Sequence, residues 1–449
     1  MKTYRLQGAQ LLCAGLILVS SVLLSANGLQ AQTSESDAPL SGQAQLITLE
    51  KTFDTIETQN FSVLIQNELV VSALETANRA RAGVLPRVDL SGRQVRTRGS
   101  GAGVVGSSVR NSFNTKLSAT IPLVDAKAIT DSRVGKFNYE ISQLDTKSTV
   151  QDILQIAGSA YFTHLRNLAR REVIEANIAR DKVLFELANN QFKAGVATPI
   201  DVTRAEVQLA TDEKDMLQQD TAVIQSELEI KRLLAMNLDT TIILERMDPN
   251  ETALNISAEG MSTVLGNRPE YEKAQRTLER NQYARKMAPW EQAPTVDLIG
   301  EYGVADETPF NGNLQDEWLI GVAFTMPIFD GWNIRSNKLQ ADSLVRQQQY
   351  VVKQLEDQLG ADYRLSLQDV RSRFQQIAIS RKRVSLSEKE LDLARTRFQQ
   401  GVADNRDVVE AQANLAFAHD GLVESIYQYN LSRLALARVR GNVRLILVN

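Results

Sequence analysis

The chain has 449 residues, 43% of them hydrophobic, and its 50 basic and 54 acidic side chains leave a net charge of −4. The charges are spread along the sequence, and no basic tract indicates a nucleic-acid partner. The one cysteine, Cys13, lies in an apolar segment near the start, so we expect no disulfide or thiol chemistry in the mature protein.

Residues 1–31 have the layout of a secretory signal peptide. Lys2 and Arg5 precede an apolar run, and small and polar residues follow it. The run is about 14 residues long, short of the roughly 20 that a transmembrane helix needs. The residues before Cys13 do not fit a lipid-anchor signal. We therefore predict a cleaved signal peptide, followed by a flexible N-terminal segment at 32–46.

Two long stretches of the sequence contain no proline, residues 123–198 and 328–449. Proline inside a helix costs about 3 kcal/mol, so its absence favours uninterrupted helices. Apolar residues in these stretches recur every three or four positions, as in an amphipathic helix. A continuous helix from Ala126 to Ala194 would be on the order of 100 Å long. Such helices need partner helices to cover their apolar stripes.

Between the helical stretches the apolar residues alternate with polar or small ones, which is typical of strands. The four predicted strands are about 85–97, 112–123, 294–305 and 316–328. Segments of about ten residues fit tilted membrane strands, and they equally fit a small water-soluble sheet packed on helices. Four strands cannot close a barrel, and an open edge cannot face lipid. If the strands span a membrane, several chains must pool them.

A helix-glycine-helix pattern occurs twice. FKAGVATPIDVTRAEVQLA begins at Phe192, and FQQGVADNRDVVEAQANLA begins at Phe398, 206 residues later. Gly195 and Gly401 fit the left-handed position that ends a helix, so each stretch is predicted as the tip of a helical hairpin. The predicted organisation is a first repeat at 47–236 with its tip at 195–199, an equatorial linker at 237–262, a second repeat at 263–440 with its tip at 401–405, and a C-terminal tail at 441–449.

Several stretches together resemble the TolC family of outer-membrane efflux ducts. Asn267-Arg268-Pro269-Glu270 is similar to the start of that family's second repeat, and IPLVDAKA at 121–128 and MPIFDGWN at 326–333 are similar to its exits from strand to helix. The Phe-x-x-Gly tips complete the set. The resemblance covers about residues 47–440.

The resemblance implies a mostly α-helical fold with a membrane β-barrel. Three identical chains would each give four strands to a 12-stranded barrel, and long coiled-coil hairpins would form a periplasmic tunnel. The implied function is the exit duct of a tripartite efflux pump or type I secretion system, in the outer membrane of a Gram-negative bacterium. The implied partners are a periplasmic adaptor protein, an inner-membrane transporter of the RND, ABC or MFS type, and outer-membrane lipid.

The resemblance also gives candidate functional residues. Asp407 and Glu410 match acidic positions that form rings of negative charge at the narrow periplasmic entrance, although Asp407 could equally cap its helix. The hairpin tips would contact the adaptor, with turn geometry alone as the alternative reading. The predicted tip residues are Gly195, Val196, Ala197, Gly401, Val402 and Ala403.

No motif indicates catalysis, a metal or a cofactor. His164 and His419 are isolated in helical stretches, without nearby residues at ligand spacing. No phosphate-binding glycine-lysine loop occurs, so energy coupling would belong to another protein. We therefore expect no enzyme. The competing interpretation is a secreted periplasmic coiled-coil protein, structural or adaptor, without a channel.

Overall fold

The computed structural model describes residues 45–99, 108–246, 260–306, 315–400, 402 and 405–447. The predicted signal peptide and most of the flexible segment lie outside the described residues, as do part of the equatorial linker and two tip residues, Gly401 and Ala403. Within the described ranges, no helix combines the length and apolar character needed to cross a membrane.

Two helices dominate the structure, α4 (Ala126–Lys193) with 68 residues and α8 (Asn333–Gln399) with 67. Neither contains a proline, which removes the main cause of helix breaks. The Asp125 side chain caps α4 by accepting a hydrogen bond from the backbone of Ala128 at 2.9 Å. The long helix expected from Ala126 onward is therefore present as one element.

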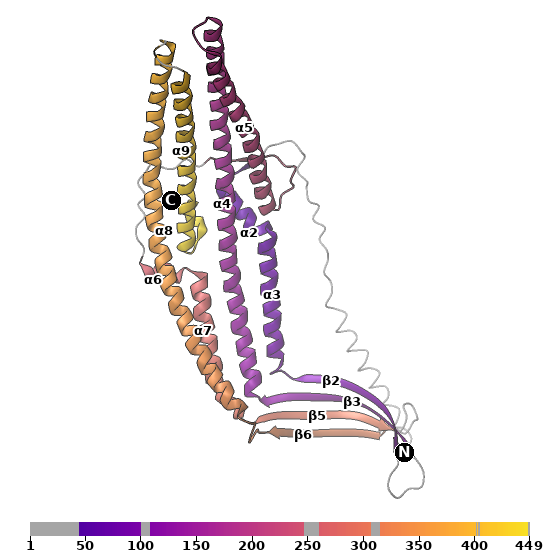
Figure 1. The fold of residues 1–449 in the computed structure, drawn as a ribbon. Coiled ribbons are helices and arrows are strands. Elements are labelled where there is room, and N and C mark those ends of the chain that lie inside the picture. Colours follow the sequence, from indigo (N-terminus) through magenta and orange to yellow (C-terminus); the bar gives the residue numbers. More distant parts are fainter. Residues whose placement is uncertain are drawn as a thin grey trace. The chain divides into compact units, whose positions relative to one another are not determined.

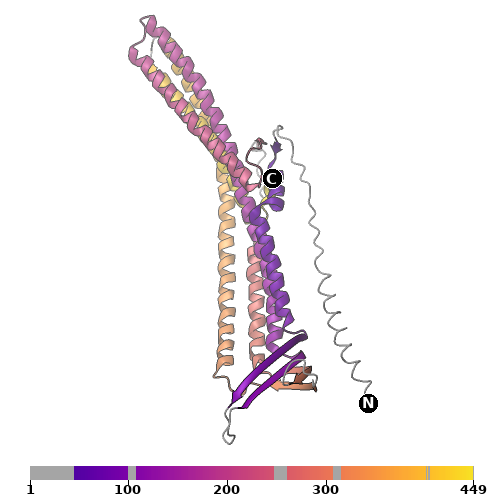
Figure 2. The ribbon, with the colours of Figure 1, turned by 90° about the vertical axis from the view of Figure 1, so that its right-hand side faces the viewer.

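Each long helix folds back on a shorter antiparallel partner (Figures 1 and 2). α5 (Pro199–Leu233) packs on α4, and α9 (Asn405–Val439) packs on α8. The two hairpins also contact each other through α4 and α9. A shared apolar core fills the space between them, with buried side chains that include Leu184, Ala188, Ala205, Leu391, Val408 and Leu415.

The shorter helices extend the layer toward the strands. α2 (Leu49–Gln59) and α3 (Phe61–Ala82) pack on α4, and α7 (Pro269–Met287) lies between α4 and α8. A single turn of helix, α6 (Met261–Gly266), precedes α7, and a 3₁₀ turn, η1 (Ala288–Gln292), follows it. The layer order is thus α3, α4, α7 and α8.

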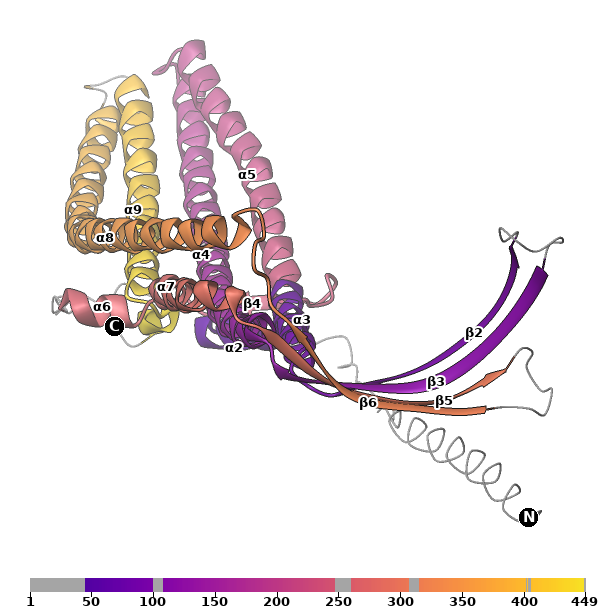
Figure 3. The same cartoon turned by 90° about the horizontal axis from the view of Figure 1, so that it is seen from below.

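Four of the strands form an antiparallel sheet in the order β2, β3, β5, β6 (Figure 3). Their bounds are β2 (Arg87–Gly99), β3 (Ser108–Val124), β5 (Thr295–Asp306) and β6 (Gln315–Thr325). β6 ends before Pro327, three residues earlier than expected, because proline has no N–H for the ladder. Neither edge strand, β2 nor β6, has a second neighbour among the described residues.

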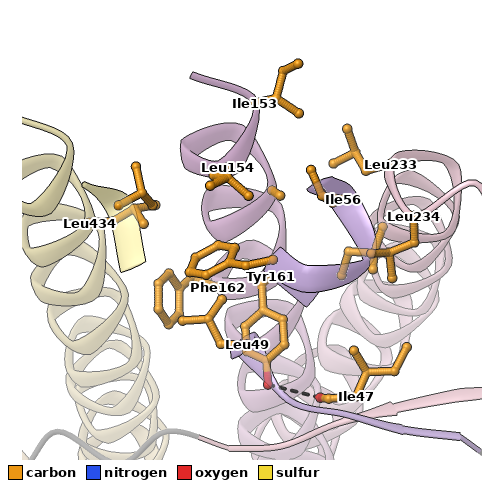
Figure 4. Close-up of a cluster of buried hydrophobic side chains, with 14 of the residues drawn as sticks. Ile47, Leu49, Ile56, Ile153, Leu154, Tyr161, Phe162, Leu233, Leu234 and Leu434 are labelled. Carbon is orange, nitrogen blue, oxygen red and sulfur yellow. Dashed lines mark hydrogen bonds between the residues drawn. The ribbon is translucent and has the colours of Figure 1, made fainter. Parts of the chain in front are cut away.

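A second sheet consists of two short parallel strands, β1 (Gln45–Ile47) and β4 (Ile242–Leu244), which are about 200 residues apart in sequence. The sequence analysis missed both, placing one in a flexible segment and the other in a linker. Three residues are too few to show a period. Tyr161 of α4 explains their position, because its hydroxyl donates to the carbonyl oxygens of Glu245 at 2.7 Å and Ile47 at 3.3 Å (Figure 4).

The predicted C-terminal tail is also part of the core. It forms a 3₁₀ turn, η2 (Val443–Leu447), in which Val443 and Ile446 are buried beside Phe53 and Ile56 of α2. No periodic pattern predicts this turn, because five residues are too few to show a helical repeat. Helices from both repeats and both ends of the described chain therefore meet in one cluster.

A buried ion network joins the two repeats beside this cluster. Arg438 of α9 contacts Glu270 of α7 and Asp152 of α4, and Arg268 lies 3.2 Å from the other oxygen of Glu270. Burial raises the pKa of Glu270, but the hydrogen bond from Arg438 and the charges of both arginines lower it to about 2. The Asn-Arg-Pro-Glu motif thus supplies two members of a structural network.

Candidate functional site

The register of the sheet places the alternating apolar residues of all four strands on one face. Leu90, Leu117, Tyr302 and Trp318 lie side by side across β2, β3, β5 and β6. On β6 the apolar residues are highly exposed, with Trp318 at 74% and Ile320 at 75%. Among the described residues, no helix packs extensively on a strand of this sheet, which argues against a small water-soluble sheet packed on the helices.

The opposite face of the sheet is polar. The side chains on this face include those of Asp89, Asn114, Lys116, Ser118 and Glu301. Lys116 Nζ lies 2.8 Å from Glu301 Oε2, an ion pair that links β3 to β5. An apolar face without a cover opposite a polar, charged face is the pattern of a strand layer between lipid and a wet passage.

At the first hairpin tip, Gly195 ends α4 with φ +75°, the left-handed conformation predicted for it. Thr198 then starts α5, and both its backbone N–H and its hydroxyl donate to the Asp201 carboxylate, at 2.9 and 2.6 Å. Val196 is 72% exposed beyond this turn. The tip is a fixed turn that presents an apolar side chain.

At the second tip the described residues are Val402, which is 68% exposed, and those from Asn405 onward. Asn405 is fully buried, and its side-chain amide donates to the carbonyl oxygen of Asp201 at 2.9 Å. This bond ties the start of α9 to the start of α5. The sequence analysis did not single out Asn405, because an asparagine at a helix start is expected to cap its own helix.

Asp407 and Glu410 lie in the first turns of α9, and both side chains are exposed. Val408 and Ala411, between and after them, are buried in the hairpin core. The two carboxylates are therefore neighbours on the exposed surface of α9, with Asp407 at the edge toward α8 and Glu410 farther from the buried stripe. The two predicted entrance residues are together, one turn apart.

The two carboxylates differ in their partners. Arg397 of α8 lies 3.6 Å from Asp407, and both side chains are about half exposed, so this pair is weak. Glu410 has no ion pair within the described part of the chain. Sequence reasoning missed Arg397 because it precedes the tip by a full turn and meets Asp407 only when the hairpin closes.

The first hairpin contains an acidic pair that the sequence analysis did not find. Asp181 of α4 and Asp212 of α5 face each other, and Asp181 is 3% exposed. Burial and the neighbouring Asp212 carboxylate raise the pKa of Asp181 to about 7, and burial also raises the pKa of Asp212. The residues are 31 apart in sequence, so only the antiparallel fold of the hairpin brings them together.

The histidines do not form a site in the described residues. His164 is 3% exposed, its Nδ1 lies 2.9 Å from the Ser226 hydroxyl, and burial lowers its pKa. His419 likewise has its pKa lowered by burial. No group of three histidine, cysteine or acidic side chains able to hold a metal ion occurs in the ranges that the structure describes.

Comparison with known proteins shows which family has this architecture. The sequence model of the family described as "Outer membrane efflux protein" matches residues 56–236 and 260–442, one match per repeat. The chain belongs to the outer membrane efflux protein family. Its members are non-enzymatic, trimeric outer-membrane components of tripartite efflux pumps, which work with an adaptor and an inner-membrane transporter.

Individual relatives are distant. The chain is 23% identical over 391 residues to nodulation protein T of Rhizobium leguminosarum bv. trifolii, covering 83% of this chain and 80% of the relative. It is 21% identical over 410 residues to outer membrane protein TolC of Escherichia coli, covering 83% and 78%. The Campylobacter jejuni CmeC outer membrane channel shares the fold, with a TM-score of 0.79 at 17% identity over 88% of this chain and 85% of that one.

Family membership decides between the two interpretations left open by the sequence. The protein is an outer-membrane exit duct for efflux, located in the Gram-negative outer membrane and extending into the periplasm. Its fold is the TolC-like helical tunnel with a barrel, as the resemblance implied. The open edges of β2 and β6 follow from this, because the barrel closes only between chains.

Proposed function

We propose that the hairpin tips form the periplasmic entrance of this duct and that Asp407 and Glu410 make it cation-selective. The observation that carries the proposal is the placement of the two carboxylates, both exposed and one turn apart at the start of α9, beside the second hairpin tip. In a trimer the two positions give two rings of three carboxylates. A ring of negative charge attracts cations and disfavours anions.

Glu410 carries more of this selectivity than Asp407. Arg397 offsets part of the charge of Asp407 at 3.6 Å, whereas Glu410 has no ion-pair partner in the described part of the chain. A fixed charge about 4 Å from a cation is worth about 1 kcal/mol in water. That energy corresponds to about a fivefold change in relative permeability.

The test is the reversal potential of purified trimers in a lipid bilayer under a salt gradient. The variant carries Asp407→Ala and Glu410→Ala, and the matched control carries Glu186→Ala and Glu213→Ala, two exposed acids of the first hairpin. We expect the variant's cation preference to fall about fivefold and the control's to stay near wild type. Equal reversal potentials in variant and wild type would contradict the entrance role.

We further propose that the tips dock the periplasmic adaptor through apolar side chains. Val196 and Val402 are 72% and 68% exposed, each beside a tip glycine. Exposed apolar residues at a fixed turn fit a protein interface better than solvent. Val196→Asp with Val402→Asp should abolish crosslinking to the adaptor and raise drug sensitivity of cells, while trimers in the outer membrane persist. Retained crosslinking would show that the tips contribute only turn geometry.

A further inference from the structure

A hollow of about 630 Å³ lies on the helical layer close to the sheet. It runs between α3 and α4 and reaches α7, and its lining includes Leu74, Arg81, Ile129, Arg133, Lys136 and Tyr283. Val84, which also lines it, comes three residues before β2, and Ile129 comes five after the end of β3. The hollow therefore lies where membrane strands pass into periplasmic helices.

The hollow combines an apolar floor with positive charge. Leu74, Ala77 and Ile129 provide apolar surface, and no acidic residue lines the space. Within the described residues, the side chains of Arg81, Arg133 and Lys136 make no ion pair or hydrogen bond. The Arg133 guanidinium lies 5.4 Å from the centre of the Phe137 ring instead. Three cations beside an apolar hollow lack a counter-charge.

The chirality of the L-amino acids and of the right-handed helix determines on which side of the helical layer the hollow opens. The Lys116 carbonyl oxygen points toward β2, where the Ser91 hydroxyl donates to it, while the Lys116 side chain lies on the polar face. An observer on that face who sees β3 run downward therefore has β2 on the left, because the residues are L-amino acids.

The helices continue in the order of the strands, so α3 lies to the left of α4 and α7 to its right, on opposite sides of it as Figure 1 shows. On α4, Gly135 faces α3 and Phe137 faces α7. α4 is right-handed and runs downward for this observer, and successive residues are about 100° apart around its axis. With Gly135 on the left and Phe137 on the right, the side chains of Ile129 and Lys136 lie on the side of α4 away from the observer. The hollow opens on the side that continues the apolar sheet face.

We propose that this hollow binds a phospholipid of the periplasmic leaflet, with its phosphate on the three cations and its acyl chains on the apolar floor. Charge complementarity selects the occupant, since a phosphate supplies the missing counter-charge and the adjoining chains match the lining. The depth fits as well, because headgroups lie where the strands end. The lipid would fill the outer groove between α3 and α4 and fix their angle to the sheet.

Lipid binding to the intact trimer tests the proposal. Delipidated trimers in detergent are titrated with phosphatidylglycerol, and bound lipid is counted by native mass spectrometry. The variant carries Arg81→Gln, Arg133→Gln and Lys136→Gln, and the control carries Arg79→Gln, Lys182→Gln and Lys193→Gln, three exposed cations of the same helices. Each cation near a lipid surface contributes about 1 kcal/mol, or about a fivefold factor, so we expect the variant, which lacks three cations, to bind roughly a hundredfold more weakly.

Four outcomes would overturn the proposal. If the variant bound the lipid within about threefold of wild type, the three cations would not contribute to binding. If the control lost as much affinity as the variant, the lipid would be bound by surface charge in general. Dissociation of the trimer in the variant alone would make the hollow a contact between copies of the chain. Ser132→Trp fills the hollow but keeps every charge, so it should also weaken binding about tenfold or more. Undiminished binding by that variant would show that the hollow itself is not used.

Discussion

The two helical hairpins have the same backbone but different chemistry. α5 and α9 are both 35 residues long, and Ala205 and Ala411 occupy matching buried positions in them. Yet the buried Asp181 of the first hairpin corresponds to Ser387 in the second, 206 residues later, and Asp212 corresponds to Ala418. Apolar residues and turn glycines therefore set the hairpin, and polar positions are free to diverge.

The tips diverge in the same way. Asp201 is tied to its own tip by Thr198 and has Arg204 as its neighbour one turn on, with Arg204 Nη1 3.8 Å from its carboxylate. At the matching positions the second tip has Asp407 and Glu410, both exposed. The first tip is close to neutral, and the second carries an acid without a partner in the described residues. Duplication has thus produced one structural tip and one charged tip.

The largest effect should come from breaking the junction that holds the two repeats together. Arg438→Ala removes the cation that Glu270 and Asp152 share and leaves Glu270 paired with Arg268 alone. Removing one partner of a buried ion pair costs about 3 to 5 kcal/mol, and we expect the lower end of that range because Arg268 remains. Unfolding of the detergent-solubilised trimer in guanidinium checks this, with the exposed Arg371→Ala as control. A loss no larger than the control's would mean that the network is not structural.

The ion network around Glu270 also predicts that the folded protein loses stability at low pH. The folded-state pKa of Glu270 is about 2, below its ordinary 4.5, so its contribution is present above pH 4.5 and is lost as the pH falls toward 2. In the Arg438→Ala variant the pKa of Glu270 should rise, because the hydrogen bond and charge that lower it are gone. The loss of stability on acidification should therefore begin at a higher pH than in wild type.

A smaller effect of opposite sign should come from making the first hairpin like the second. Asp181→Ser with Asp212→Ala copies Ser387 and Ala418 and removes the buried carboxyl pair. The pKa of Asp181 is raised from 3.8 to about 7, so its folded form holds a proton that the unfolded chain releases, and stability falls as the pH rises between those values. Above that window the variant should be more stable by about 1 to 4 kcal/mol.

The pH profile distinguishes this pair from general surface charge. Wild type should lose stability between about pH 4 and 7, and the variant should be flatter there. The charge of Arg180 lowers the pKa of both carboxyl groups, the hydrogen bond from Gln208 lowers that of Asp212, and the charge of Asp215 raises it. These effects act through the pair, so they disappear with it in the variant. Identical profiles for the two proteins would mean that Asp181 and Asp212 titrate normally.

The helices and the sheet could be predicted because their signals are periodic and long. Proline-free stretches gave α4 and α8, and period-two segments gave the four strands of the sheet. The short β1, β4 and η2 could not be found this way, since three to five residues contain no repeat. Their positions depend on tertiary contacts, such as the Tyr161 hydroxyl bonds to Ile47 and Glu245.

In the candidate site, too, the residues that could be predicted are those with a local sequence signal. Asp407 and Glu410 followed from their resemblance and their spacing on one helix face, which is local information. The bond from Asn405 to Asp201, the approach of Arg397 to Asp407 and the pairing of Asp181 with Asp212 all depend on packing between distant segments. A single sequence shows which residues share a helix face, but not which faces meet.

The most direct test of the two-tip account exchanges one charge at each tip. The measurement is the reversal potential of trimers carrying Glu410→Arg or Arg204→Glu, in bilayers under a salt gradient. Because three copies act in each ring, we expect Glu410→Arg to remove or invert the cation preference and Arg204→Glu to keep or raise it. Unchanged selectivity in Glu410→Arg would contradict the claim that the second tip forms the charged entrance of the duct.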